Sequence, residues 1–103
     1  MELLEVESIN YDTNEVEVLF DGVFQNGFIV KTDFDYDKEQ TEFEDSRTGE
    51  RDYFEATNIS LWYLTLMDVE GKEFTINNRE LNTIKQMIEN ELTNLLTDYI
   101  NDN

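Results

Sequence analysis

The sequence predicts an α+β fold: an antiparallel sheet of about five strands within residues 2–76, with one long helix at about 78–100 packed on one face. Apolar and polar residues alternate with a period of two over most of the first three quarters of the chain, which is typical of half-buried strands. The last quarter places apolar residues three and four positions apart, as in a helix with one buried face. The 103 residues fit a single domain, 1–103.

The first two strands are expected to be joined by a tight turn. Leu4 and Val6 lie on the apolar side of the first alternating segment, and the phase changes afterwards, so we expect a β-bulge near Ser8. Asp12-Thr13-Asn14 is typical of a turn. The second strand runs to Asp21-Gly22, and its apolar face is expected to consist of Val16, Val18 and Phe20.

The third strand has the clearest alternation in the chain. Its apolar face is expected to hold Phe28, Val30, Thr32, Phe34 and Tyr36. Its polar face is expected to hold Lys31, Asp33, Asp35 and Asp37. The polar residues 38–52 that follow predict either a loop or a weak strand around Phe43, with a turn at Thr48-Gly49.

Residues 59–67 are apolar on both faces when numbered as a regular strand. Leu61, Tyr63 and Met67 fall on one face, and Trp62, Leu64 and Leu66 fall on the other. Such a strand belongs in a sheet that is covered on both sides. Because one helix covers one face only, we expect the second face to be covered by curling of the sheet or by a second subunit. Glu70-Gly71 then predicts a turn into a short strand at 73–76.

The C-terminal helix has agreeing signals at its start and along its length. Asn77 is placed to cap the first turn, and Glu80 lies three residues later, as in a capping box. The apolar stripe is expected to consist of Leu81, Ile84, Ile88, Leu92, Leu95 and Tyr99.

Composition excludes several kinds of chemistry. The chain has no histidine and no cysteine, so imidazole bases, thiolate nucleophiles and the nitrogen or sulfur ligands of zinc are all missing. We therefore predict that the protein is not an enzyme and uses no cofactor or metal. The absence of cysteine also favours a cytoplasmic location.

Three aspartates of the third strand also fit part of a calcium-binding motif. Asp33, Asp35, Asp37 and Glu44 fall at positions one, three, five and twelve of an EF-hand loop. Lys38 stands where that loop needs glycine, and no helix is predicted on either side. The strand interpretation is favoured, with the three aspartates pointing outward.

Acidity is the unusual property of this sequence. Twenty-five acidic and seven basic residues give a net charge of −18, beyond the magnitude of about 2–8 that solubility needs. Residues 1–77 carry 20 acidic and 5 basic side chains, and residues 78–103 carry 5 and 2. Such a charge disfavours direct binding to nucleic acids or membranes and attracts basic partners.

The acidic side chains of the strands are expected to form one partner-binding face. Its predicted members are Glu5, Glu7, Glu15, Glu17, Asp33, Asp35, Asp37, Glu42 and Glu44. In charge, size and lack of cysteine the chain resembles small phage-encoded DNA mimics, such as anti-restriction and some anti-CRISPR proteins. That resemblance implies an interaction module that occupies the basic surface of a nucleic-acid-binding protein. The alternative is a small structural or assembly protein that forms a homodimer through Trp62, Leu64 and Leu66.

Overall fold

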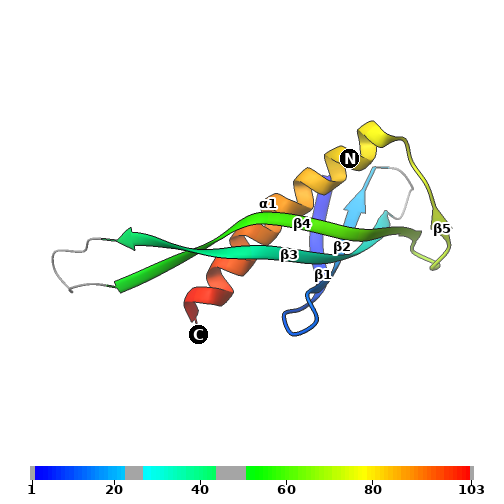
Figure 1. Ribbon diagram of the computed structural model, residues 1–103. Helices are drawn as coiled ribbons and strands as arrows, with labels where there is room; N and C mark the ends of the chain where they lie inside the picture. Colours follow the sequence, from blue (N-terminus) through cyan, green and yellow to red (C-terminus); the bar gives the residue numbers. More distant parts are fainter. Residues whose placement is uncertain (1, 23–26, 44–50, 103) are drawn as a thin grey trace.

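The predicted α+β architecture is confirmed by a computed structural model, which describes residues 2–22, 27–43 and 51–102. Five antiparallel strands form one sheet in the order β1-β2-β3-β4-β5, and a single helix follows them (Figure 1). The strands are β1 (Glu2–Asn10), β2 (Glu15–Asp21), β3 (Phe28–Phe43), β4 (Arg51–Asp68) and β5 (Glu73–Phe74), and the helix is α1 (Asn78–Asp102). Each strand pairs with its neighbour in sequence, so the sheet is a simple meander.

Two strands are much longer than the others, and they make the molecule elongated. β3 has 16 residues and β4 has 18, and their paired ends extend beyond the rest of the sheet as an arm (Figure 1). The molecule measures 52 × 24 × 22 Å, with a radius of gyration of 16.1 Å, against about 13 Å for a compact domain of this size. The segment 38–52, for which the sequence predicted either a loop or a weak strand, belongs to β3 and β4 in its described parts. The turn predicted at Thr48-Gly49 lies outside the described residues.

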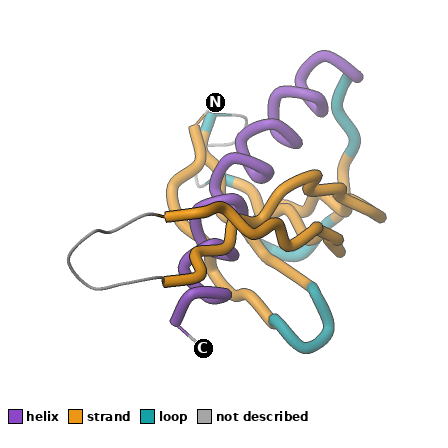
Figure 2. Tube along the Cα trace, turned by 60° about the vertical axis from the view of Figure 1, so that its left-hand side comes forward, coloured by secondary structure: helices purple, strands orange, loops and turns teal. Residues whose placement is uncertain are grey.

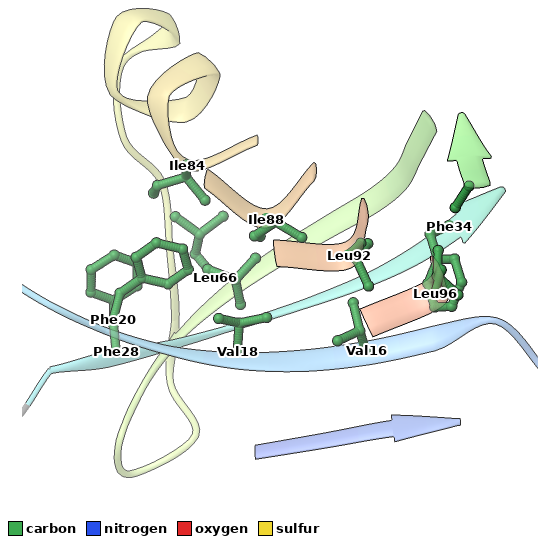
Figure 3. Packing of buried hydrophobic residues seen from close by; sticks show 12 residues of the cluster. Val16, Val18, Phe20, Phe28, Phe34, Leu66, Ile84, Ile88, Leu92 and Leu96 are labelled. Carbon is green, nitrogen blue, oxygen red and sulfur yellow. The ribbon is translucent and has the colours of Figure 1, made fainter. Parts of the chain in front are cut away.

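The core lies between α1 and one face of the sheet. Figure 3 shows the helix side chains meeting those of β2 and β3, and Figure 2 shows α1 running along that side of the strands. The buried strand residues are Val16, Val18, Phe20, Phe28, Val30, Thr32, Phe34, Ala56 and Leu66. The predicted inner faces of β2 and β3 are therefore confirmed. Each fully buried Val, Leu, Ile or Phe side chain contributes about 1.5–3 kcal/mol to folding.

The buried stripe of α1 runs strictly every fourth residue. Ile84, Ile88, Leu92 and Leu96 are fully buried, whereas Leu95, predicted to belong to the stripe, is only half-buried. A row of residues four apart is inclined to the helix axis, and such rows are the ridges that pack against a neighbouring layer. The helix begins as predicted: the Asn77 side-chain oxygen accepts a hydrogen bond of 2.8 Å from the Glu80 backbone N–H.

β1 departs from the predicted alternation because it contains two bulges. Its pairing with β2 shifts by one residue at Leu4 and again at Glu7, so the bulge expected near Ser8 is present and has a companion. Each bulge adds a residue that has no partner on β2. The side chains that reach the core are therefore three apart, at Leu3, Val6 and Ile9. Leu4, predicted to face the core, is half exposed.

β4 also contains two bulges, and they correct the prediction of a second apolar face. The register against β3 shifts around Asn58 and around Tyr63, and both residues have left-handed φ angles, 51° and 56°. Each shift reverses the side on which the following residues point. Leu64 and Leu66 therefore pack against the core, whereas Trp62 stays exposed on the opposite face. The three residues do not share a face.

The end of α1 closes the free edge of β4. The Asn101 side-chain amide donates a hydrogen bond of 2.8 Å to the Phe54 carbonyl, and its oxygen accepts one of 3.1 Å from the Phe54 N–H. Thr97 Oγ1 accepts a third bond, of 3.2 Å, from the Ala56 N–H. Side chains of the helix thus replace the strand that would otherwise pair with this edge. Beside them, the rings of Tyr11 and Tyr99 stack with centroids 3.9 Å apart, which ties the β1–β2 turn to the helix.

We expect Asn101→Ala to lower the free energy of unfolding by about 1–2 kcal/mol relative to Asn94→Ala, because it removes both bonds to Phe54. Asn94 is an exposed asparagine of the same helix, so both variants gain helix propensity and only one loses the contact. Urea denaturation measures the difference. Equal stability of the two variants would show that the edge contact contributes nothing.

Candidate acidic interaction surface

The sheet face opposite α1 is acidic. We call this surface the acidic face and define it by nine of the carboxylates that the strand register directs there, apart from Glu2, Asp21 and Glu73 near its end. They are Glu5, Glu7, Glu15, Glu17, Asp33, Asp35, Asp37, Glu39 and Glu55. Among the outward-facing strand residues whose side chains the structure describes, Lys31 is the one cation. Seven of the nine predicted members are thus brought together on one surface.

Two predicted members are not placed on this face, and two of its members were missing from the prediction. Glu42 lies in β3 opposite Asp52, and Glu44 lies outside the described residues. Glu39 continues the alternation of the three aspartates of β3, so the sequence already contained its signal. Glu55 is directly opposite Glu39, which only the register of β3 against β4 reveals.

Like charges stand directly opposite one another on this face. Glu15 pairs with Asp33 across β2 and β3, and Glu39 pairs with Glu55 across β3 and β4. Directly opposed side chains have Cβ atoms about 4.5–5.5 Å apart, and like-charged pairs at that distance destabilise a sheet. The face therefore concentrates negative charge at some cost to folding.

Three of the carboxylates are bonded to a cationic or neutral donor within the protein. A Glu17 oxygen lies 3.1 Å from the Lys31 ammonium, in a surface ion pair that contributes about 0–1 kcal/mol. Asp35 accepts a hydrogen bond of 3.0 Å from the indole N–H of Trp62. Asp37 accepts one of 3.0 Å from the side-chain amide of Asn58. Both donors belong to the bulged parts of β4, so the bulges also orient the aspartates of β3.

Glu7, at the second bulge of β1, also belongs to this group. Repulsion from Glu5 raises the pKa of Glu7, and partial desolvation, a hydrogen bond with Glu5 and the charge of Glu17 act in the same direction. A regular strand would place Glu7 on the same side as Glu5 at a spacing of about 6.6 Å. Their mutual effect shows that the three carboxylates share one electrostatic environment at this end of the face.

Two aromatic side chains stand out from the acidic face. Trp62 is 51% exposed and Tyr63 is 86% exposed, at the second bulge of β4. A hollow of about 260 Å³ lies beside Tyr63, lined also by Glu15, Glu17, Lys31 and Asp33. A second hollow of about 360 Å³ is lined by Asp33, Asp35, Trp62 and Tyr63 together with residues of the β1–β2 turn. Asp33 and Tyr63 line both hollows, so the two adjoin.

Thr32 supports this bulge from the core side. Its hydroxyl is buried and donates a hydrogen bond of 2.9 Å to the Trp62 carbonyl. The bulge leaves Tyr63 and Leu64 without partners on β3, and the adjoining, part-buried Trp62 carbonyl would be costly to leave without a donor. The bulge therefore explains why a threonine, Thr32, stands in the otherwise apolar core row of β3.

The comparisons with protein families, with curated proteins and with solved structures find no match to this chain. Within residues 2–22, 27–43 and 51–102, no helix is long and apolar enough to cross a membrane. In the same residues, no group of three or more acidic side chains is arranged to hold a metal ion. Asp33, Asp35 and Asp37 instead alternate along an extended strand, as the strand interpretation predicted.

We expect Thr32→Val to reduce the free energy of unfolding by about 1–3 kcal/mol, because the isosteric side chain leaves the Trp62 carbonyl without its donor. Thr65→Val is the matched control, a half-buried threonine on β4, and should stay within about 0.5 kcal/mol of the wild type. Thermal unfolding, followed by Trp62 fluorescence, measures the stability of the two variants. A neutral Thr32→Val would show that the bulge does not need this bond.

The contribution of Glu7 to stability depends on pH, and the sign of this dependence follows from the raised pKa of Glu7. The folded protein holds this proton more readily than the unfolded chain, so the contribution of Glu7 to stability falls as the pH rises through the raised pKa. We expect Glu7→Gln to stabilise the protein at pH 7 and to have no such effect at pH 3. Denaturation at the two pH values measures this. Stabilisation of equal size at both would contradict repulsion as the cause.

Proposed function

We propose that this protein is a non-enzymatic interaction module whose acidic face binds the basic surface of a nucleic-acid-binding protein. The observation that carries the proposal is the gathering of nine carboxylates and one lysine on a single face of the sheet. The face opposite is covered by α1, which carries five acidic and two basic residues. The acidic face thus holds a net eight of the 18 negative charges of the chain.

The density of charge on this side approaches that of a nucleic acid. From the level of Glu5 to that of Glu39 the acidic face spans ten residues of β3, or about 33 Å. Its net eight charges give one per about 4 Å, and one strand of a duplex presents one phosphate per about 3.4 Å. A lysine- and arginine-lined groove that binds phosphates would therefore meet a comparable row of anions.

The fixed geometry of the carboxylates also supports binding to a folded partner. Side chains on a sheet are held at regular intervals, about 6.6 Å along a strand and about 4.8 Å between strands. Hydrogen bonds from Trp62 and Asn58 further orient Asp35 and Asp37. An array that is ordered before binding loses less conformational entropy when it binds.

The same proposal includes a role without catalysis and a cytoplasmic location. The chain contains no histidine and no cysteine, which supports a binding role over catalysis, without a cofactor. A cysteine-free protein with a nucleic-acid-binding partner fits best in the cytoplasm.

The homodimer alternative now has less to support it. Its motivating feature was an apolar surface made by Trp62, Leu64 and Leu66, but Leu64 and Leu66 pack against the core. Opposed copies of the acidic face would repel one another.

The proposal is tested by competition for nucleic acid. A basic DNA-binding protein is captured from bacterial lysate on the immobilised protein, released with 1 M salt, and then assayed for DNA binding with the free protein as competitor. We expect displacement of DNA by the wild type and a loss of at least tenfold in potency for the variant Asp33→Asn, Asp35→Asn, Asp37→Asn. Screening shortens electrostatic interactions to about 3 Å at 1 M salt, which explains the release.

A variant with the same net charge separates the acidic face from bulk charge. Glu70→Gln, Glu89→Gln, Asp102→Asn removes three carboxylates from a turn and from α1, so both triple variants change from −18 to −15. The control should compete as well as the wild type. If the two variants lose potency equally, the acidic face is not the binding surface.

A further inference from the structure

We propose that Trp62 and Tyr63 anchor the partner protein by binding one of its arginine side chains. This inference rests on the proposed function and deepens it, because it locates the centre of the acidic face and specifies the partner's contacting group. The aromatic pair lies where the two hollows of the face adjoin. Charge alone would attract any basic surface, whereas an aromatic anchor requires a basic side chain of the partner at one defined position.

The exposure of these rings points to a partner. Tyr63 is 86% exposed and Trp62 is 51% exposed, although both lie within a strand, where aromatic side chains usually pack. Exposed tyrosine and tryptophan are enriched at the centres of protein interfaces. Tyr63 is also held at a φ of 56°, a strained conformation that is rare for a bulky residue. Folding of the core gains nothing from a ring that projects into water.

Two of the carboxylates around the rings, Glu15 and Asp33, have neither an ion pair nor a side-chain hydrogen bond among the described residues. Glu17 is paired with Lys31, and Asp35 is bonded to Trp62. Glu15 and Asp33 face each other across β2 and β3, and both line the hollow beside Tyr63. A cation placed there would relieve their repulsion and lie close to an aromatic ring. The sheet face therefore has charge complementarity for one basic side chain at this position.

Arginine fits this arrangement better than lysine does. Its planar guanidinium stacks on aromatic rings and donates paired hydrogen bonds to carboxylates, whereas an ammonium is a compact, strongly hydrated charge. Asp33 lies in both hollows beside Tyr63, so one guanidinium is able to contact a carboxylate and a ring together. Thr32 on the core side and Asp35 on the outer side hold the Trp62 end of the anchor in place.

The test uses short cationic peptides and the intrinsic fluorescence of Trp62, which is the only tryptophan of the chain. Hexa-arginine and hexa-lysine carry the same charge and are titrated into the intact protein. We expect hexa-arginine to change the fluorescence and to bind at least about fivefold more tightly than hexa-lysine, the size of one cation–π contact. Tyr63→Leu should abolish the preference, and Tyr63→Phe, which keeps the ring, should retain it.

A control variant and the competition experiment distinguish the possible outcomes. Val69→Ala truncates an exposed apolar side chain in the β4–β5 turn and should leave the preference unchanged. Equal affinity for the two peptides in the wild type would overturn the aromatic anchor while leaving the competition experiment on the acidic face intact. Retention of the preference in Tyr63→Leu would overturn the anchor as well. Loss of DNA competition with the arginine preference preserved would instead reject the nucleic-acid-binding partner and keep the anchor.

Discussion

Four aliphatic side chains of α1, spaced every fourth residue, hold the sheet from one side, and the rest of the structure depends on this one-sided packing. Ile84, Ile88, Leu92 and Leu96 cover the inner positions of β2, β3 and β4. A single helix covers one face of the sheet and leaves the other face uncovered. The outer positions were therefore left to water, and they could accumulate carboxylates without burying any of them.

The bulges reconcile an irregular sequence with this single core. β1 has apolar residues at intervals of three, and residues 59–67 of β4 are apolar at nearly every position. In a regular strand these patterns would send apolar side chains to both faces. The extra residues at Leu4, Glu7, Asn58 and Tyr63 reset the phase. Most of the apolar side chains in these strands thus reach the core, at the cost of exposing Leu4 and the aromatic pair.

What the sequence could predict follows from how local each signal is. The Asn77 cap, the existence of the helix and the inner faces of β2 and β3 depend on nearby residues and were predicted correctly, although Leu95 rather than Leu96 was placed in the helix stripe. The largest error lay in β4, where a strict period of two put Trp62, Leu64 and Leu66 on one face. No proline or glycine marks the bulge at Tyr63, so only pairing with β3 reveals it. The contact of Asn101 with Phe54 was unpredictable for the same reason, because 47 residues separate its two partners.

The contact of Asn101 and Thr97 with β4 also bears on how copies of this protein meet one another. An unpaired strand edge is a template for edge-to-edge polymerisation, a hazard for any sheet. Here β5 pairs with one part of the β4 edge, helix side chains occupy another, and the opposite edge of the sheet, β1, is distorted by two bulges. Protection of this kind does not depend on charge. These parts of the sheet edges therefore stay blocked when salt screens the carboxylates, or when a bound partner neutralises them, whereas β3 beyond Asp33 pairs with no described strand on its β2 side.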